Sequence, residues 1–120
     1  MPRRSEPDPF AEEVGRRIRQ LREAAGLTLE KLAFESELGS KGHLSSLERG
    51  LVRPTVETLR VLAERLRVLP ADLLIFPEAG DRETLIDLTR GLPRNRLQGM
   101  IRELRKNRTA QPSTVTGARK

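Results

Sequence analysis

Residues 26–62 read GLTLEKLAFESELGSKGHLSSLERGLVRPTVETLRVL, and this stretch decides the fold. Leucine and alanine recur in it at spacings of three and four residues, which is the period of an amphipathic helix. Thr28, Ser40 and Thr55 each stand just before such a run, where a hydroxyl can cap the first turn. The stretch therefore predicts three consecutive helices, over about 29–36, 41–49 and 55–66.

The flanking residues predict further helices and no strands. Upstream, Asp8 and Pro9 have the residue types of a helix start, and Gly26 those of a helix end. Downstream, a short helix begins at Pro70, a break follows at 77–80, and two amphipathic segments cover 82–91 and 93–107. We predict an all-α chain. A disordered arm (1–8) precedes a five-helix domain (9–77), and a C-terminal helical extension (81–107) is followed by a disordered basic tail (108–120).

The composition excludes several classes of protein. A chain of 120 residues without cysteine has no disulfide, no thiolate nucleophile and no cysteine-based zinc site. With one histidine, no metal site is expected, and no cofactor either. No apolar run is long enough to cross a membrane and the N-terminus lacks a secretory signal, so we expect a cytoplasmic, nucleoid-associated protein.

The net charge of +6 is unevenly distributed along the chain. From residue 90 onward there are nine basic residues and one acidic residue, a net charge of +8, so residues 1–89 carry a net charge of −2. A basic protein suggests a nucleic-acid partner, but here the basic residues lie mostly outside the helices of residues 26–62. The argument for DNA binding must therefore come from the motif.

The motif consists of short residue groups in a fixed register. These groups are Leu21-Arg22, Gly26-Leu27-Thr28, Leu32-Ala33, Leu44-Ser45, Leu47-Glu48-Arg49-Gly50, Pro54-Thr55 and Glu57-Thr58-Leu59. Through them, about residues 10–76 resemble the Cro- and Xre-like phage-repressor family of helix-turn-helix proteins. The resemblance implies a five-helix lambda-repressor-like domain in a sequence-specific, double-stranded-DNA-binding transcriptional regulator. It further implies a repressor that acts as a homodimer, with helix 41–49 in the major groove.

The resemblance also assigns roles to particular residues. The base-reading positions are Lys41, Gly42 and Ser46, flanked by His43 and Ser45. The expected phosphate contacts are Thr28, Ser40, Arg49 and Arg53. Arg22 and Glu48 match a family pair that forms a buried salt bridge between the first and third helices, with the role of orienting them.

The sequence departs from the family pattern in two ways. The turn between the second and third helices holds one residue more than usual. Arg, Gln and Asn, which read bases through two hydrogen bonds, are absent from positions 41–46, so Lys41 is the one strong base contact expected there. We therefore hypothesise that specificity depends more on DNA shape, apolar contacts and half-site spacing than on many base hydrogen bonds.

Other functions compete with this interpretation. The main alternative is an antitoxin-like module that neutralises a protein partner through residues 82–107 and also represses its own promoter; the same residues can instead pack within the chain or form a dimer. A general binder of single strands or RNA is disfavoured because Trp and Tyr are absent. We predict no enzyme, because His43 and Ser46 lack an orienting acid and no other catalytic set is present.

Overall fold

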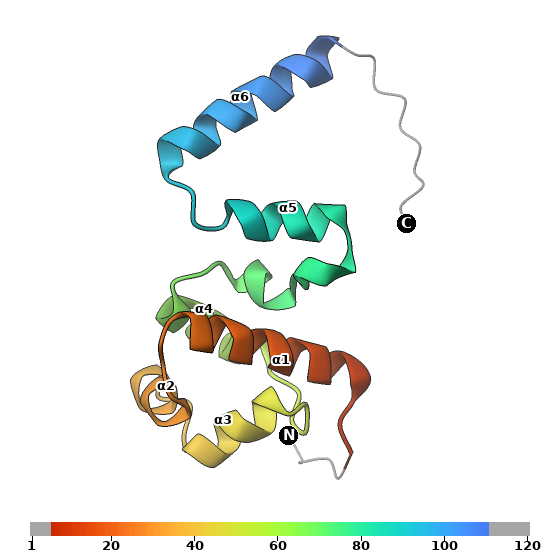
Figure 1. The fold of residues 1–120 in the computed structure, drawn as a ribbon. Coiled ribbons are helices and arrows are strands. Elements are labelled where there is room, and N and C mark those ends of the chain that lie inside the picture. Colours follow the sequence, from red (N-terminus) through yellow and green to blue (C-terminus); the bar gives the residue numbers. More distant parts are fainter. Residues whose placement is uncertain (1–5, 111–120) are drawn as a thin grey trace. The chain divides into compact units, whose positions relative to one another are not determined.

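The computed structural model describes residues 6–110, and all of their regular structure is helical (Figure 1). The α-helices are α1 (Pro9–Ala24), α2 (Leu29–Ser36), α3 (Lys41–Glu48), α4 (Val56–Leu66), α5 (Asp81–Thr89) and α6 (Arg94–Ala110). Two short 3-10 helices, η1 (Pro70–Leu74) and η2 (Pro77–Ala79), lie between α4 and α5. The all-α prediction is confirmed.

The first four α-helices begin where a side chain can satisfy a free backbone N–H group. The Asp8 carboxylate accepts a hydrogen bond from the amide of Ala11 at 3.1 Å. The hydroxyls of Thr28, Ser40 and Thr55 accept from the amides three residues later, at 3.0, 3.2 and 3.1 Å respectively. The predicted caps of all four helices are confirmed.

Several predicted boundaries need correction. The short helix that begins at Pro70 is a 3-10 helix that ends at Leu74, and the predicted break at 77–80 contains a second 3-10 turn. The last helix continues to Ala110, so residues 108–110 belong to it and not to the predicted tail. The predicted arm is ordered at its end, because the Asp8 amide donates to the Gly50 carbonyl at 3.3 Å. Residues 1–5 and 111–120, the rest of the predicted arm and tail, lie outside the described residues.

The chain divides into two compact units, residues 1–87 and 88–120. The first unit therefore continues past the predicted domain end at residue 77. Arg17 explains this, since its buried guanidinium donates to the Asp72 carbonyl at 3.0 Å and to the Asp87 carboxylate at 2.8 Å. This contact ties the C-terminal half of α5 to α1.

The core of the first unit is built from aliphatic side chains of α1, α2, α3, α4 and η1. Its fully buried members are Ile18, Leu32, Leu44, Leu47, Leu62 and Leu73. Within this unit α1 crosses α3, and α2 and α4 flank them (Figure 1). Burial of these side chains fixes α3 against the rest of the domain while one side of it stays open.

No helix within residues 6–110 is both long enough and apolar enough to cross a lipid bilayer.

Candidate nucleic-acid interface

The backbones of α1 and α3 approach each other closely at Gly15. A Cβ atom on Gly15 would lie 2.4 Å from the carbonyl oxygens of both Leu47 and Glu48, so only glycine fits there. A Cβ atom on Gly50, at a φ of +77°, would lie 2.6 Å from the Cα of Glu12. The sequence pattern does not single out Gly15, although a glycine inside an amphipathic helix is the signal for such a contact.

A buried ion pair joins the same two helices. The Arg22 Nε donates to the Glu48 Oε2 at 2.7 Å, and the Arg22 Nη2 to the Glu48 Oε1 at 3.2 Å. The Arg22 Nη1 also donates to the Leu27 carbonyl at 2.7 Å. The two side chains are only 10% and 6% exposed, so the predicted buried pair is present in the structure. Its two-point geometry fixes the rotation of α3 about its own axis.

The turn between α2 and α3 contains two residues in the left-handed conformation. Glu37 follows α2 in the left-handed conformation at a φ of +56°, and Gly39 has a φ of +101°. Between them Leu38 packs against the hydrophobic core. Two left-handed residues on either side of the partly buried Leu38 define the path by which the chain enters α3.

The exposed side of α3 carries most of the residues expected to read bases. Lys41, Gly42 and His43 are exposed, and Ser45 is half-buried. Lys41, Ser45 and Arg49 recur every four residues and therefore lie along one face of the helix. Arg49 caps the C-terminal end of α3, where its Nε donates to the Ser45 carbonyl at 3.4 Å.

Ser46 does not belong to this exposed face. It is only 3% exposed, and this burial argues against the base-reading role predicted for it. The chain turns back immediately after α3, and the Leu51 amide donates to the Ser46 carbonyl at 3.0 Å.

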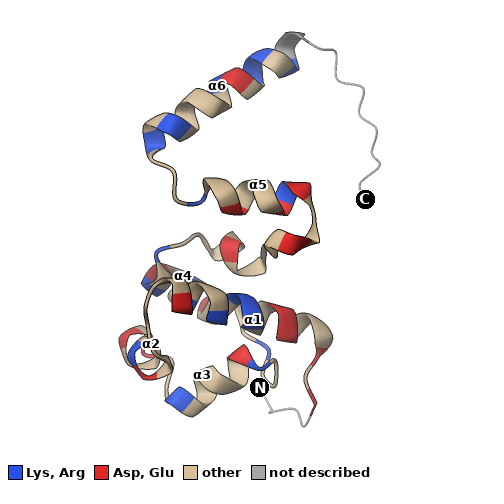
Figure 2. Cartoon of the chain, in the orientation of Figure 1, with Lys and Arg blue, Asp and Glu red and all other residues tan. Residues whose placement is uncertain are grey.

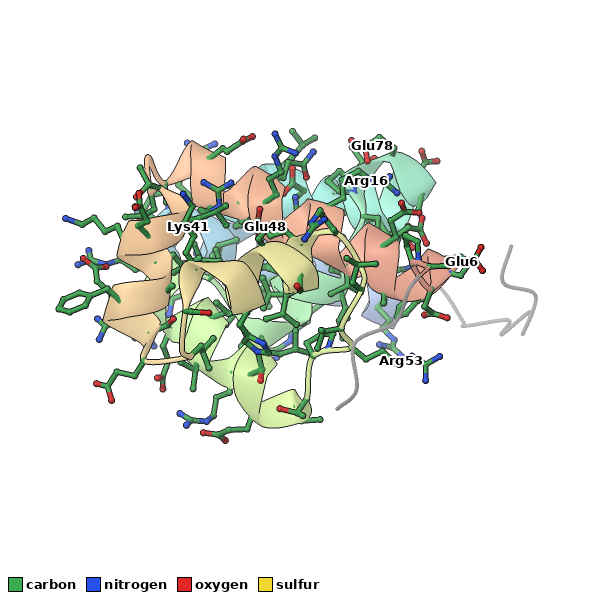
Figure 3. All side chains as sticks on the ribbon, turned by 90° about the horizontal axis from the view of Figure 1, so that it is seen from below. Glu6, Arg16, Lys41, Glu48, Arg53 and Glu78 are labelled. Carbon is green, nitrogen blue, oxygen red and sulfur yellow. The ribbon has the colours of Figure 1, made fainter. Side chains whose placement is uncertain are left out.

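The four expected phosphate contacts lie at the ends of α2 and α3 or in the loop that follows α3. Thr28 and Ser40 are exposed, and each hydroxyl that accepts a backbone hydrogen bond keeps its own proton to donate. Arg53 is half-exposed and pairs with Asp8 at 3.3 Å. Seen from the side that carries α3, Lys41 and Arg53 lie toward opposite ends of the helix (Figure 3).

Within residues 6–110, no three His, Cys, Asp or Glu side chains gather into a set that could hold a metal ion. The chemistry that the exposed face of α3 offers is hydrogen bonding and positive charge, from Lys41, Ser45 and Arg49.

A family profile described as "Helix-turn-helix domain" matches residues 13–74, more than half of the chain. The chain belongs to this helix-turn-helix family of DNA-binding transcriptional regulators. The matched region contains α2, the turn and α3, together with most of α1, all of α4 and η1. The predicted resemblance to the Cro- and Xre-like regulators is confirmed.

Curated relatives carry names of the same kind. The chain is 38% identical over 76 residues to the HTH-type transcriptional regulator DdrOP3 of Deinococcus deserti. This match covers 63% of this chain and 58% of the relative. It therefore spans little more than half of that protein's length. The chain is also 34% identical over 70 residues to control protein C.BamHI of Bacillus amyloliquefaciens. This match covers 58% of this chain and 85% of the relative.

Solved structures show the same fold. The clp gene regulator ClgR from C. glutamicum matches with a TM-score of 0.54 and 35% identity, over 60% of this chain and 91% of that one. A chain of the SinR protein/SinI protein complex matches with a TM-score of 0.58 and 27% identity, over 82% of this chain and 99% of that one.

Proposed function

We propose that this helix-turn-helix protein is a sequence-specific repressor that binds duplex DNA as a homodimer, with α3 in the major groove. One observation carries the proposal: α3 is locked to α1 by the buried Arg22–Glu48 pair, and its opposite side is exposed. A major groove about 12 Å wide admits one α-helix, whose first turns then face the bases. A rigidly mounted helix with an open polar face meets this requirement.

The proposed contacts follow from exposure. Lys41 makes the main base contact, to guanine, and Gly42 lets the backbone approach the DNA. Ser45 and His43 make secondary contacts to the bases. With so few reading groups, the shape and deformability of the DNA supply a large share of the specificity.

The phosphate contacts use groups that already have a local role. Thr28 and Ser40 donate their hydroxyl protons from the N-terminal ends of α2 and α3, where the helix dipole also favours an anion. Arg49 contributes from the end of α3, and Arg53 exchanges Asp8 for a phosphate oxygen. These contacts set the position of α3 along the groove rather than its sequence preference.

The homodimer is proposed because a single recognition helix reads only a few base pairs. Large apolar side chains within residues 82–107 remain exposed, and burying them between two copies would remove them from water. The most exposed are Leu85, Leu88, Ile101 and Leu104. Repression then follows from occupation of the promoter DNA.

The experiment is selection of duplexes from a random pool by the full chain, followed by footprinting. We expect a site with two-fold symmetry and half-sites about 34 Å, or one helical turn, apart or at a multiple of that spacing. Changing the central, non-contacted base pairs should weaken binding. Selection that enriches no sequence would contradict the proposal.

A second candidate function is binding of a protein partner through residues 82–107, as in an antitoxin-like module. The exposed apolar side chains in this range support it, and so does the likeness to a chain of the SinR protein/SinI protein complex, which covers 82% of this chain. Sedimentation of the purified chain alone separates the two uses. A stable dimer supports the first, and a monomer that forms a heavier complex only with a co-purified protein supports the second.

A further inference from the structure

Helix α6 carries a row of polar, mostly basic residues along one face. Arg94, Gln98, Arg102 and Lys106 follow one another at intervals of four residues, and each is exposed. This spacing places them along one side of the helix over about 18 Å. The apolar residues Leu97, Met100 and Leu104 lie on the neighbouring side, and Ile101 lies between the two sets. We call the first set, together with the adjacent Arg105, the basic face of α6.

The charge of α6 contrasts with that of the first unit. Six basic residues and one acidic residue, Glu103, lie within residues 94–110, whereas residues 1–87 have a net charge of −2. In the described part of the first unit, six of the twelve basic residues pair with a carboxylate; they are Arg17, Arg19, Arg22, Lys31, Arg53 and Arg60. Figure 2 shows the blue positions that dominate α6. Sequence-independent attraction to DNA requires excess positive charge, which the unit that carries α3 does not have.

We propose that the basic face of α6 contacts the phosphate backbone of duplex DNA beside the site that α3 reads. This inference rests on the proposed function, because it adds affinity to a protein that already binds duplex DNA. Phosphates of one strand follow each other along the axis about every 3.4 Å, so a face of this length can neutralise several of them. The apolar side of α6 stays available for the dimer.

The test compares two variants that lose the same charge. The first is Arg94→Gln/Arg102→Gln/Lys106→Gln, on the basic face. The second is Arg19→Gln/Arg60→Gln/Arg82→Gln, on exposed positions of α1, α4 and α5. Affinity for a selected duplex and for a scrambled duplex is measured by fluorescence anisotropy at a series of salt concentrations.

Each phosphate contact contributes about 0.9 to the slope of log affinity against log salt concentration. The α6 variant should therefore lower that slope by about 2 to 3 and weaken both duplexes about equally, so the ratio of their affinities stays unchanged. The control variant should change the slope by less than about 1. Equal slopes for the two variants would overturn the inference while leaving the proposed function intact.

Two further measurements separate the remaining explanations. An Arg94→Lys/Arg102→Lys variant keeps the charge, so it should keep the wild-type slope; a loss of slope there would contradict a purely phosphate-directed role. Vesicles of phosphatidylserine and phosphatidylcholine test the alternative of a membrane surface. Binding to vesicles that depends on the basic face, with no change in DNA affinity, would overturn the inference. Equal affinity of the wild-type protein for the selected and the scrambled duplex would overturn the proposed function itself.

Discussion

The helices of residues 9–66 and helix α6 are both amphipathic, but they use their side chains in opposite ways. In the first group, Leu32, Leu44 and Leu62 are fully buried, and the Arg22 guanidinium is held by Glu48. In α6, Leu104 is 62% exposed and the basic residues have one acid among them. The comparison teaches that the buried contacts that orient α3 and the excess positive charge lie in different parts of the chain.

The largest effect is expected from removing one member of the buried pair. Glu48→Ala leaves the Arg22 guanidinium buried without its carboxylate, which should lower the free energy of unfolding by about 3–5 kcal/mol. Urea unfolding followed by circular dichroism measures this. The control is Glu64→Ala at an exposed site of α4, and the double change Arg22→Met/Glu48→Leu should restore most of the loss. Equal costs at Glu48 and Glu64 would show that the pair does not anchor α3.

Leu→Ala substitutions compare directly how much a leucine of each region contributes to the stability of the first unit. Leu32→Ala removes a fully buried side chain of α2 and should lower the free energy of unfolding by about 2–5 kcal/mol. Leu104→Ala, on α6, should change the unfolding of the first unit by less than about 0.5 kcal/mol. The same denaturation assay, at a protein concentration where the chain is monomeric, gives both values. A large cost at Leu104 would mean that α6 contributes to the folded core.

Gly→Ala substitutions in α1 and α6 should also change stability differently, by smaller amounts than the leucine substitutions. Gly15→Ala forces a methyl group onto the carbonyl oxygens of α3 and should destabilise the protein by about 1–3 kcal/mol. Around Gly99 in α6, a Cβ atom would meet only the Arg102 Nη2, at 4.0 Å, so Gly99→Ala should stabilise the helix by up to about 1 kcal/mol. Thermal unfolding of both variants checks the signs, and a neutral Gly15→Ala would contradict the close approach of α1 and α3.

The smallest effect concerns the exposed charges at the start of α4. A hydrogen bond from Arg60 lowers the pKa of Glu57, against an opposing effect of desolvation. Because the pKa is lower when folded, this stabilisation is present above the ordinary pKa of glutamate and is lost as the pH falls through the folded value. Glu57→Gln should therefore reduce the acid-induced fall in Tm slightly, relative to Glu78→Gln. A Glu57→Gln profile that matches wild type at every pH would contradict the prediction.

The sequence is sufficient to predict what depends on local chemistry. The hydroxyl caps at Thr28, Ser40 and Thr55 follow from residue type and position, and the bounds of α2 and α4 follow from them. The pair of Arg22 with Glu48 could be predicted only through the resemblance to a family, since the two residues are far apart in the chain.

What the sequence does not predict depends on how segments pack. Ser46 shares a helical face with the exposed Gly42, yet it is buried in the folded unit, and helical periodicity alone does not show this difference. The contacts of Arg17 with Asp72 and Asp87 join residues that no local pattern connects, and the first unit contains α5 as far as Asp87. Helical periodicity also cannot distinguish the 3-10 helix η1 from a short α-helix.

The most direct test of α3 as the recognition helix is the effect of Lys41→Ala on sequence preference. Its matched control is Lys31→Ala, an exposed lysine of α2. Affinity for the selected duplex, divided by affinity for a scrambled duplex, is measured at one salt concentration for wild type and both variants. The ratio should fall about tenfold to a hundredfold for Lys41→Ala, the worth of one good base contact, and stay at the wild-type value for Lys31→Ala. An unchanged ratio for Lys41→Ala would contradict the assignment of base reading to the exposed face of α3.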